Sequence, residues 1–410
     1  MRFVPNSRRL IFICEHVVDT NSAQGSRIIK LVNGFLELGC HVCIFEKQWD
    51  GWYEIHLTSE GNLDKYAELD NLSGFERVHV GLPLFIPVWS LLRLVISPFA
   101  KDSTIYISST SPSFILLCFL AKWNGVKLLT DIGEWQGTDY DVPIYSPFKR
   151  FKIKYKIWRF LAIALSDFCV AITSRIASEI ESRRGRAIVV PGLLAEKEII
   201  NLKSVNFGQR VLPHKKVNLS DSEELDSFLY AGTMKGSDGI DLLFKALINL
   251  YCRGYRFKMY TCGPFSKREL KEFLRSYDIE IELSHFNWIH LGFLSSEHYR
   301  SIISRVSLVV IPRPAHIESN HYSFPTRVLD TIGSGGSFAT ATVGDIPKYF
   351  TPMIDYVDLV GGSVSEIESS LGAFLSKAAF FDSKSVAPKC RVSRLDAFSA
   401  TSCASRLLML

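Results

Sequence analysis

The sequence is poor in the features that mark membrane-spanning, secreted and disordered proteins. Its most apolar stretch, residues 80–100, is interrupted by prolines and by Arg93, so it does not predict a spanning helix of about 20 residues. No secretory signal is visible, because the short apolar run after the basic start ends at Glu15. The content of 47% hydrophobic and 22% charged residues is that of an ordinary globular protein. We therefore expect a cytoplasmic protein that folds throughout its length.

The sequence also lacks a pattern of paired cysteines. It has nine cysteines, an odd number, and several lie in apolar runs, as Cys14 and Cys118 do. This usage indicates reduced, buried thiols. Cys40 and Cys43 form the one CxxC motif, in a predicted strand where residues three apart point to opposite faces. We expect no shared metal ion and no redox pair there.

The length of 410 residues exceeds what one hydrophobic core usually spans, so we expect two domains. Predicted strands and helices alternate in both halves, which indicates two doubly wound parallel sheets of the α/β class. A polar, irregular stretch separates the halves. The predicted parts are a first Rossmann-like domain at 1–200, a linker at 201–226, a second Rossmann-like domain at 227–380 and a final segment at 381–410.

Residues 322–336 combine a helix start with a candidate anion site. Pro325 suits the first position of a helix, and the glycines from Gly333 onward suit its end. An apolar stripe on this helix leaves Thr326, Arg327 and Asp330 together on the opposite side. The free N–H groups and Arg327 would suit a phosphate, and Asp330 would accept hydrogen bonds from sugar hydroxyls. A buried helix with a solvated polar side is the open alternative.

Other predicted strand ends carry glycines and cations, where doubly wound sheets bind ligands. In the second half these are Gly232, Gly263, Lys235 and Arg313, and the two cations would attract a diphosphate or be ordinary surface residues. In the first half, Gly25 lies in the loop after the first strand. That loop lacks GxGxxG, so a plain connection is equally open.

The stretch from Asp131 to Trp135 follows a predicted strand of the first half directly. We predict that Glu134 faces the reacting centre, and a helix cap or a surface charge are the alternatives. Asp139 and Asp141 resemble the DxD metal clamp of another transferase architecture with a different strand order. We discount that likeness and predict no metal site.

The net charge of +5 is modest, but cations are concentrated in one segment that alternates them with aromatic and aliphatic residues. A segment of this kind would bind anionic lipid headgroups and place the protein peripherally on the inner face of the membrane. A solvated face or a nucleic-acid patch are the alternatives, and we expect no nucleic acid. The predicted membrane residues are Lys149, Arg150, Lys152, Lys154, Lys156, Trp158 and Arg159.

The order of these pieces resembles the GT-B fold of nucleotide-sugar glycosyltransferases. The resemblance is to the large retaining family that includes sucrose-phosphate synthases and many bacterial polysaccharide and lipopolysaccharide transferases. It covers nearly the whole chain. The motifs that carry it are Ala231-Gly232, residues 239–246, residues 261–264, residues 291–293 and residues 324–330 with the glycine turn that follows.

The resemblance implies a function for each domain. The second domain would bind a nucleoside diphosphate sugar as co-substrate, the first would bind a glycan or lipid-linked acceptor, and the last segment would cross back to the first. The sugar would be transferred with retention of configuration, without metal or other cofactor. The implied donor-binding residues are Gly25, Gly232, Thr233, Lys235, Gly263, Arg313, Ser323, Phe324, Thr326, Arg327 and Asp330.

The sequence departs from the family pattern at several positions. The paired glutamates of the family would fall on Tyr322 and Asp330, so only the second carboxylate is present. The arginine and lysine of the family's pyrophosphate clamp are replaced by Thr233 and Asp238. Lys235, Arg313 or Arg327 would have to substitute. A sugar-nucleotide epimerase of the same fold and a catalytically inactive nucleotide-sugar-binding module are therefore the alternative functions.

Overall fold

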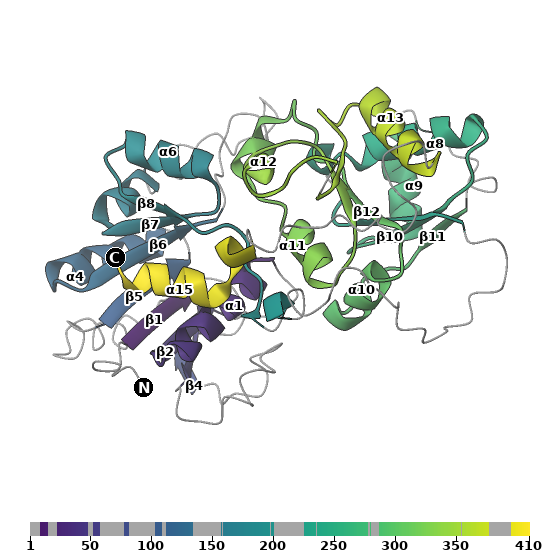
Figure 1. Cartoon of the computed structure of the whole chain (residues 1–410). Helices are drawn as coiled ribbons and strands as arrows, with labels where there is room; N and C mark the ends of the chain where they lie inside the picture. The colour runs from purple at the N-terminus through teal and green to yellow at the C-terminus, as the bar shows by residue number, and fades with distance from the viewer. Residues whose placement is uncertain are drawn as a thin grey trace. The chain divides into compact units, whose positions relative to one another are not determined.

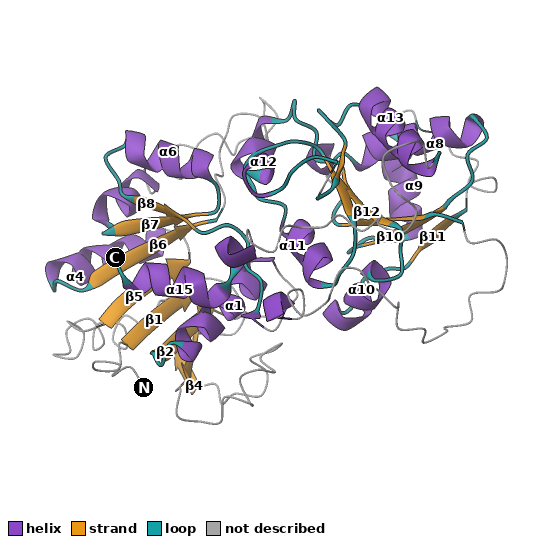
Figure 2. Cartoon of the chain, viewed as in Figure 1, coloured by secondary structure: helices purple, strands orange, loops and turns teal. Residues whose placement is uncertain are grey.

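The computed structural model divides the chain into two compact units (Figure 1). One unit comprises Met1–Glu196 with Ala397–Leu410, and the other comprises Lys197–Asp396. Each unit is an α/β layered structure built on its own sheet (Figure 2). The structure describes residues 9–14, 23–47, 52–57, 78–81, 103–108, 112–133, 157, 159–196, 198–200, 225–234, 236–277, 279, 287–353, 355–376 and 395–410.

The sheet of the first unit has eight strands in the order β4-β3-β2-β1-β5-β6-β7-β8. The strand order reverses at β1, which lies between β2 and β5 and runs parallel to both. Strands β3 and β4 are added antiparallel at the edge beyond β2. The strands are β1 (Arg9–Cys14), β2 (His41–Lys47), β3 (Trp52–Leu57), β4 (Val78–Gly81), β5 (Ser103–Ser108), β6 (Lys127–Ile132), β7 (Phe168–Ala171) and β8 (Ala187–Val189).

Helices cover both faces of this sheet because alternate residues of the parallel strands point to opposite sides. In β1, Leu10 and Phe12 belong to the core beneath α1 and α15, whereas Ile11 and Ile13 belong to the core beneath α4. The last helix, α15, packs beside α1 although the two are far apart in sequence (Figure 1). The helices are α1 (Ala23–Glu37), α4 (Pro112–Trp123), α6 (Ser174–Ser182) and α15 (Ala400–Leu408), and residues 157 and 159–165 are also helical.

The sheet of the second unit has six parallel strands in the order β11-β10-β9-β12-β13-β14. Its order reverses between β9 and β12, which pair with each other. The apolar residues of these strands are almost fully buried, as expected for a parallel sheet covered on both faces. The strands are β9 (Ser227–Ala231), β10 (Lys258–Cys262), β11 (Trp288–His290), β12 (Leu308–Ile311), β13 (Phe338–Thr340) and β14 (Val357–Asp358).

Side-chain caps set the starts of several helices in the second unit. Ser266 and Glu269 form a reciprocal capping box at α9, and Ser363 and Glu366 form another at α13. The helix predicted near Pro325 begins one residue later, at Thr326, with Pro325 as its N-cap. The helices are α8 (Ile240–Cys252), α9 (Lys267–Arg275), α10 (Ser296–Ile303), α11 (Thr326–Gly333), α12 (Ile346–Tyr349) and α13 (Val364–Leu375).

The predicted α/β class with two Rossmann-like sheets is confirmed. The expectation of wholly parallel sheets is wrong at one edge of the first unit, where β2, β3 and β4 are antiparallel neighbours. The dipeptide Asp50-Gly51 between β2 and β3 is a common hairpin signal and could have indicated this. None of the helices among the described residues is both long and apolar enough to cross a bilayer.

The cysteines follow the prediction with one exception. Cys40 and Cys43 lie in the cores on opposite faces of the first sheet, as expected for residues three apart around a strand. Eight cysteines are described as free thiols, and Cys252 is the exposed one among them. Burial raises the pKa values of Cys118, Cys169 and Cys262 to about 12, which makes these thiols unreactive at neutral pH.

Candidate functional site

The candidate site lies at the carboxyl edge of the second sheet, where the strand order reverses. Strand β9 leads into a loop at Gly232, and the neighbouring β12 leads into a loop at Arg313. In a doubly wound sheet the chain leaves these two strands in opposite directions and opens a crevice beyond their ends. Helix α11 follows the second loop and brings Arg327 back to the end of β9.

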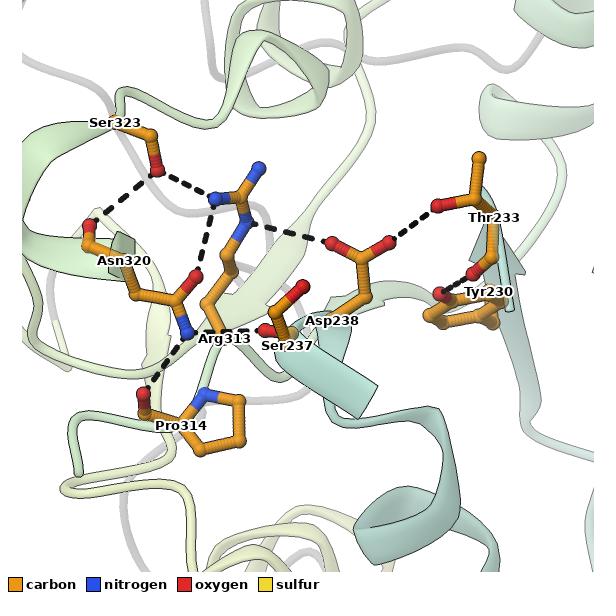
Figure 3. Close-up of polar contacts among 8 residues, drawn as sticks. All are labelled: Tyr230, Thr233, Ser237, Asp238, Arg313, Pro314, Asn320 and Ser323. Carbon is orange, nitrogen blue, oxygen red and sulfur yellow. Dashed lines mark hydrogen bonds and ion pairs between the residues drawn. The ribbon is translucent and has the colours of Figure 1, made fainter. Parts of the chain in front are cut away.

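A network of hydrogen bonds fastens the two loops to each other (Figure 3). The Thr233 hydroxyl donates to Oδ2 of Asp238 over 2.7 Å, and the Tyr230 hydroxyl donates to the Thr233 carbonyl over 2.7 Å. Asn320, only 2% exposed, donates to the carbonyls of Ser237 and Pro314 over 3.0 and 2.9 Å. The side chain of Asn320 therefore bridges the loop after β9 and the loop after β12.

Arg313 belongs to this network, and its backbone is in the left-handed region with a φ of 43°. Its Nη1 donates to the Ser323 hydroxyl over 2.5 Å and to Oδ1 of Asn320 over 3.2 Å. Its Nε lies 4.0 Å from Oδ1 of Asp238. The guanidinium predicted to bind a diphosphate thus faces a carboxylate and ties Ser323 to the loop. Holding the network together is the better supported role.

The structure shows what the side chains contact at the two positions where the family pattern has its pyrophosphate clamp. Thr233 and Asp238, which replace the arginine and lysine of the family pattern, bind each other. Asp238 also sets a negative charge beside Arg313. At these two positions the chain thus carries a neutral and an anionic side chain, and both belong to the hydrogen-bond network of the loop.

Arg327 is a further cation at the end of β9. A Cβ atom on Gly232 would overlap its guanidinium group, so the backbone there passes directly over the positive charge. The guanidinium also lies 5.8 Å from the centre of the Tyr230 ring. Among the described residues, no carboxylate forms an ion pair with Arg327, whereas Arg313 has Asp238.

The surroundings of Arg327 keep it charged. Burial by itself lowers the pKa of Arg327, but Tyr230, Asp238 and Tyr299 outweigh this effect and leave the pKa above its ordinary value. The Tyr299 hydroxyl of α10 is buried without a hydrogen-bond partner among the described residues. Burial, followed by the nearby Asp330 carboxylate, raises the pKa of Tyr299 well above its usual range. Sequence reasoning missed Tyr299, because nothing in its local pattern places it beside α11.

Helix α11 has the predicted division into an apolar and a polar side. Its apolar stripe, made of Val328, Leu329 and Ile332, is at most 5% exposed. Thr326, Arg327 and Asp330 are only partly buried. The N–H groups of the first turn have no acceptor within the helix, apart from that of Val328, which donates to the Pro325 carbonyl over 2.9 Å.

Two other predicted donor-site residues, Gly263 and Phe324, lie in the same unit. A Cβ atom on Gly263 would overlap the carbonyl of Gly232, so glycine is required where the ends of β9 and β10 meet. Phe324 is 3% exposed and its ring packs edge to face against Tyr349, which makes it part of the core. Tyr322, at the position of the family's first glutamate, is also buried.

A second buried polar cluster lies at the carboxyl edge of the first sheet. Arg27 of α1 forms an ion pair with Asp131 at the end of β6, and Tyr106 of β5 donates to the same carboxylate over 2.7 Å. Arg27 also donates to the carbonyl of Val190 over 2.9 Å. Gly25 is buried in the first turn of α1, two residues before Arg27. Sequence reasoning passed over Arg27 and gave Asp131 no role.

Several predicted residues lie outside the described part of the chain, namely Glu134, Lys235, Lys149, Arg150, Lys152, Lys154, Lys156 and Trp158. Arg159 is described, and the prediction that it faces a membrane is wrong. It is 6% exposed, because its position on the helix turns it inward. Within the described residues, no group of three or more His, Cys, Asp or Glu side chains could hold a metal ion.

Solved structures share this fold over nearly the whole chain. A glycosyltransferase from Rickettsia africae ESF-5 is 13% identical, with 98% of this chain and 97% of that chain covered at a TM-score of 0.62. Sucrose-phosphate synthase from Thermosynechococcus elongatus is 12% identical, with 98% of each chain covered and a TM-score of 0.60. Anabaena HepE in complex with UDP-glucose is 12% identical, with 98% and 99% covered and a TM-score of 0.59.

These likenesses confirm that the chain has the GT-B fold, as the order of its motifs indicated. Identities of this size establish the fold and leave the reaction to be argued from the site. No protein-family profile and no curated protein sequence matches the chain.

Proposed function

We propose that the protein is a glycosyltransferase that takes its sugar from a nucleoside diphosphate sugar bound at the carboxyl edge of the second sheet. The observation that carries the proposal is the position of Arg327. Its guanidinium is charged, makes no ion pair with a described carboxylate and lies against the glycine at the end of β9. A diphosphate would supply the missing negative charge.

The other groups at this edge suit the remainder of such a donor. The free N–H groups of Thr326 and Arg327 at the start of α11 would donate to the phosphate oxygens. Asp330, one turn further along, would accept hydrogen bonds from the ribose hydroxyls. Gly232 and Gly263 would let the donor approach the backbone closely. Arg313 and Ser323 would hold the loop in place, and Lys235 would add charge.

In the proposed reaction, the bond from the sugar's anomeric carbon to the diphosphate breaks and a bond to an acceptor hydroxyl forms, with loss of the hydroxyl proton. Arg327 and the N–H groups would stabilise the charge that develops on the leaving diphosphate. Glu134 would orient the reacting sugar or acceptor. Retention of configuration, transfer of a hexose, and a glycan or lipid-linked acceptor belong to the proposal, as does the absence of a required metal or cofactor. The likeness in fold to HepE, solved with UDP-glucose, supports it.

The exchange of the clamp residues favours a second candidate, a binding module without catalytic activity. Thr233 and Asp238 bind each other and offer no cation to a phosphate. Such a module would bind the nucleotide sugar and leave it unchanged.

Calorimetric titration of the full chain with a panel of nucleoside diphosphate sugars tests donor binding. Arg327→Ala is expected to weaken binding roughly 10- to 100-fold, the usual range for a hydrogen bond to a charged group. Arg268→Ala, which removes an exposed arginine from α9, serves as the control and should bind as the unchanged protein does. Equal binding by Arg327→Ala, or no binding to any member of the panel, would refute the site.

Product analysis with the same panel separates the functions. Slow hydrolysis of the donor, or transfer to an added acceptor, supports the transferase. Interconversion of the donor without acceptor identifies an epimerase, and binding with no turnover identifies the module. Asp330→Ala should abolish donor turnover without changing the melting temperature, and unchanged turnover kinetics would remove Asp330 from the site.

A further inference from the structure

One helical stretch of the first unit, residues 157 and 159–165, has two large apolar side chains on its outer side. Ile157 and Phe160 are 53% and 51% exposed, and Ala164, seven residues after Ile157, is exposed as well. These positions share one side of a helix. Arg159, the charged residue of the stretch, is buried instead. A surface helix normally has the opposite arrangement, so this outer side needs an apolar partner.

Helix α4 has the same property. Phe119 and Trp123, one turn apart, are 55% and 81% exposed. Their neighbours Cys118 and Ala121 are buried, so the inward side of the helix is already satisfied by the core. Lys122 is the charged residue of α4 and also lies on the outer side. Two large aromatic side chains therefore project next to Lys122, which forms an ion pair with Asp167.

The two outward sides belong to one surface of the unit. Cys118 and Ala121 of α4 belong to the same core as Ile11 and Ile13 of β1, and Leu165 packs against that core. Lys122, near the end of α4, also forms an ion pair with Asp167, which follows the 157–165 stretch. The exposed apolar groups of both helices thus lie on one face.

Cations lie beside this face, and one of them, Arg183, is 3.6 Å from the Glu179 carboxylate of α6. The loop after α6 contributes the exposed Arg183, Arg184 and Arg186. It lies against the 157–165 stretch, since a Cβ atom on Gly185 would stand 2.7 Å from Cγ2 of Ile163. Burial, and then repulsion from Arg183, lowers the pKa of Arg159 to about 10, as expected where cations are crowded. In addition, the sequence between Asp141 and Asp167 contains six cationic and no acidic residues.

We infer that this face, formed by Phe119, Trp123, Ile157, Phe160 and the arginine loop 183–186, docks onto an anionic lipid bilayer. The apolar side chains enter the interfacial layer while the arginines pair with lipid phosphates. A second copy of the chain is a poorer partner, because it would bring the same cations against these. This face includes Ile157, which stands between Lys156 and Trp158 of the predicted lysine segment, and it does not depend on the proposed reaction.

Flotation of the full chain with vesicles tests the docking face. Vesicles of phosphatidylcholine with phosphatidylglycerol are compared with vesicles of phosphatidylcholine alone. The unchanged protein should float with the anionic vesicles and sediment with the neutral ones, and its binding should fall as salt rises. Phe119→Ser with Trp123→Ser should reduce partitioning at least about tenfold, the size expected for losing one or more buried aromatic side chains. Arg183→Glu with Arg184→Glu and Arg186→Glu should reduce it further.

Two controls match these variants. Met409→Ser removes a side chain that is 76% exposed from the opposite face of the same unit. Arg268→Glu with Lys271→Glu and Arg275→Glu reverses three charges on α9 of the other unit. Both controls should float as the unchanged protein does, and melting curves should show that all variants are folded.

Three outcomes would overturn the inference. The first is no flotation of the unchanged protein, or undiminished flotation of the docking-face variants. The second is self-association that Trp123→Ser abolishes in the absence of lipid, which would make the face a contact between copies. The third is tight binding of a nucleic acid, lost on reversal of the arginines, with no binding to vesicles. None of these outcomes would affect donor binding, so the docking face and the proposed function can fail separately.

Discussion

The carboxyl edges of the two sheets differ in how they balance the charge of an arginine. At the first sheet, Arg27 pairs with Asp131, receives support from Tyr106 through that carboxylate and also reaches the carbonyl of Val190. At the second sheet, Arg327 has the ring of Tyr230 nearby but no carboxylate partner among the described residues. The two strand orders both reverse beside these clusters.

The difference shows that the reversal of strand order provides a possible ligand site at each edge. The balance of charges at that edge then determines whether an anion can bind there. A buried cation that is fully paired fixes the structure around it, because either charge alone would be costly to bury. A cation left without an anion still favours one and can bind it from solution. The first cluster therefore stabilises its unit, and the second is suited to bind a ligand.

The largest effect should come from breaking the paired cluster. Asp131→Ala would leave the Arg27 charge buried and unpaired, which should lower the free energy of unfolding by about 3–5 kcal/mol. Glu272→Ala, which breaks the exposed pair with Arg268, should change it by no more than about 1 kcal/mol. Urea denaturation measures both. Equal effects of the two substitutions would show that the first cluster is not structural.

The cluster at the second sheet can be disturbed without removing the charge of Arg327. Gly232→Ala would place a methyl group on the Arg327 guanidinium and displace it. We expect the affinity for a nucleoside diphosphate to fall at least about tenfold, the loss of roughly one charged hydrogen bond. Gly254→Ala, at a φ of 93° with open space around the new Cβ, controls for backbone strain. Full affinity in Gly232→Ala would separate Arg327 from the binding site.

Alkaline pH should lower the free energy of unfolding of the first unit more than that of the second. The pKa values of Cys118 and Cys169 in the first unit, and of Cys262 in the second, are raised to about 12. A raised pKa in the folded state means that stability is complete below the unfolded value near 9 and is lost as pH rises toward 12. The loss should be about 1 kcal/mol per thiol between pH 8 and pH 10.

Urea denaturation at several pH values measures this loss. Cys118→Ala with Cys169→Ala should flatten the dependence on pH, whereas Cys252→Ala should not, because Cys252 is exposed. A dependence that is unchanged in the double variant would assign the alkaline loss to other groups.

The smallest effect concerns Asp238, a carboxylate at the ligand-binding edge whose charge opposes an anion. Asp238→Asn removes a negative charge beside Arg313 and near Arg327, so the affinity for a nucleoside diphosphate should rise about threefold. Calorimetry measures the change, and Glu272→Gln on α9 is the distant control. A loss of affinity would mean that Asp238 contacts the ligand directly or that the loop depends on its charge.

Much of the fold could be read from periodicity. The alternation of strands and helices in the second half predicts its parallel sheet, because the buried strands are short apolar runs between helices with clear caps. The antiparallel edge at β3 and β4 was missed, since those strands lack such runs. At the site, local pattern was enough to set Arg327 and Asp330 on the polar side of α11. It gave no sign that Arg313 faces Asp238 rather than an open crevice.

By itself, the sequence determined the elements, the parallel sheet of the second unit and the polar side of one helix, because spacing along a strand or helix dictates which residues share a face. Only the tertiary structure decided which cations are neutralised. Asp131 lies 104 residues from Arg27, and Asp238 lies 75 residues from Arg313. Such pairs form when strands distant in sequence end side by side, so electrostatic balance is a property of the folded chain.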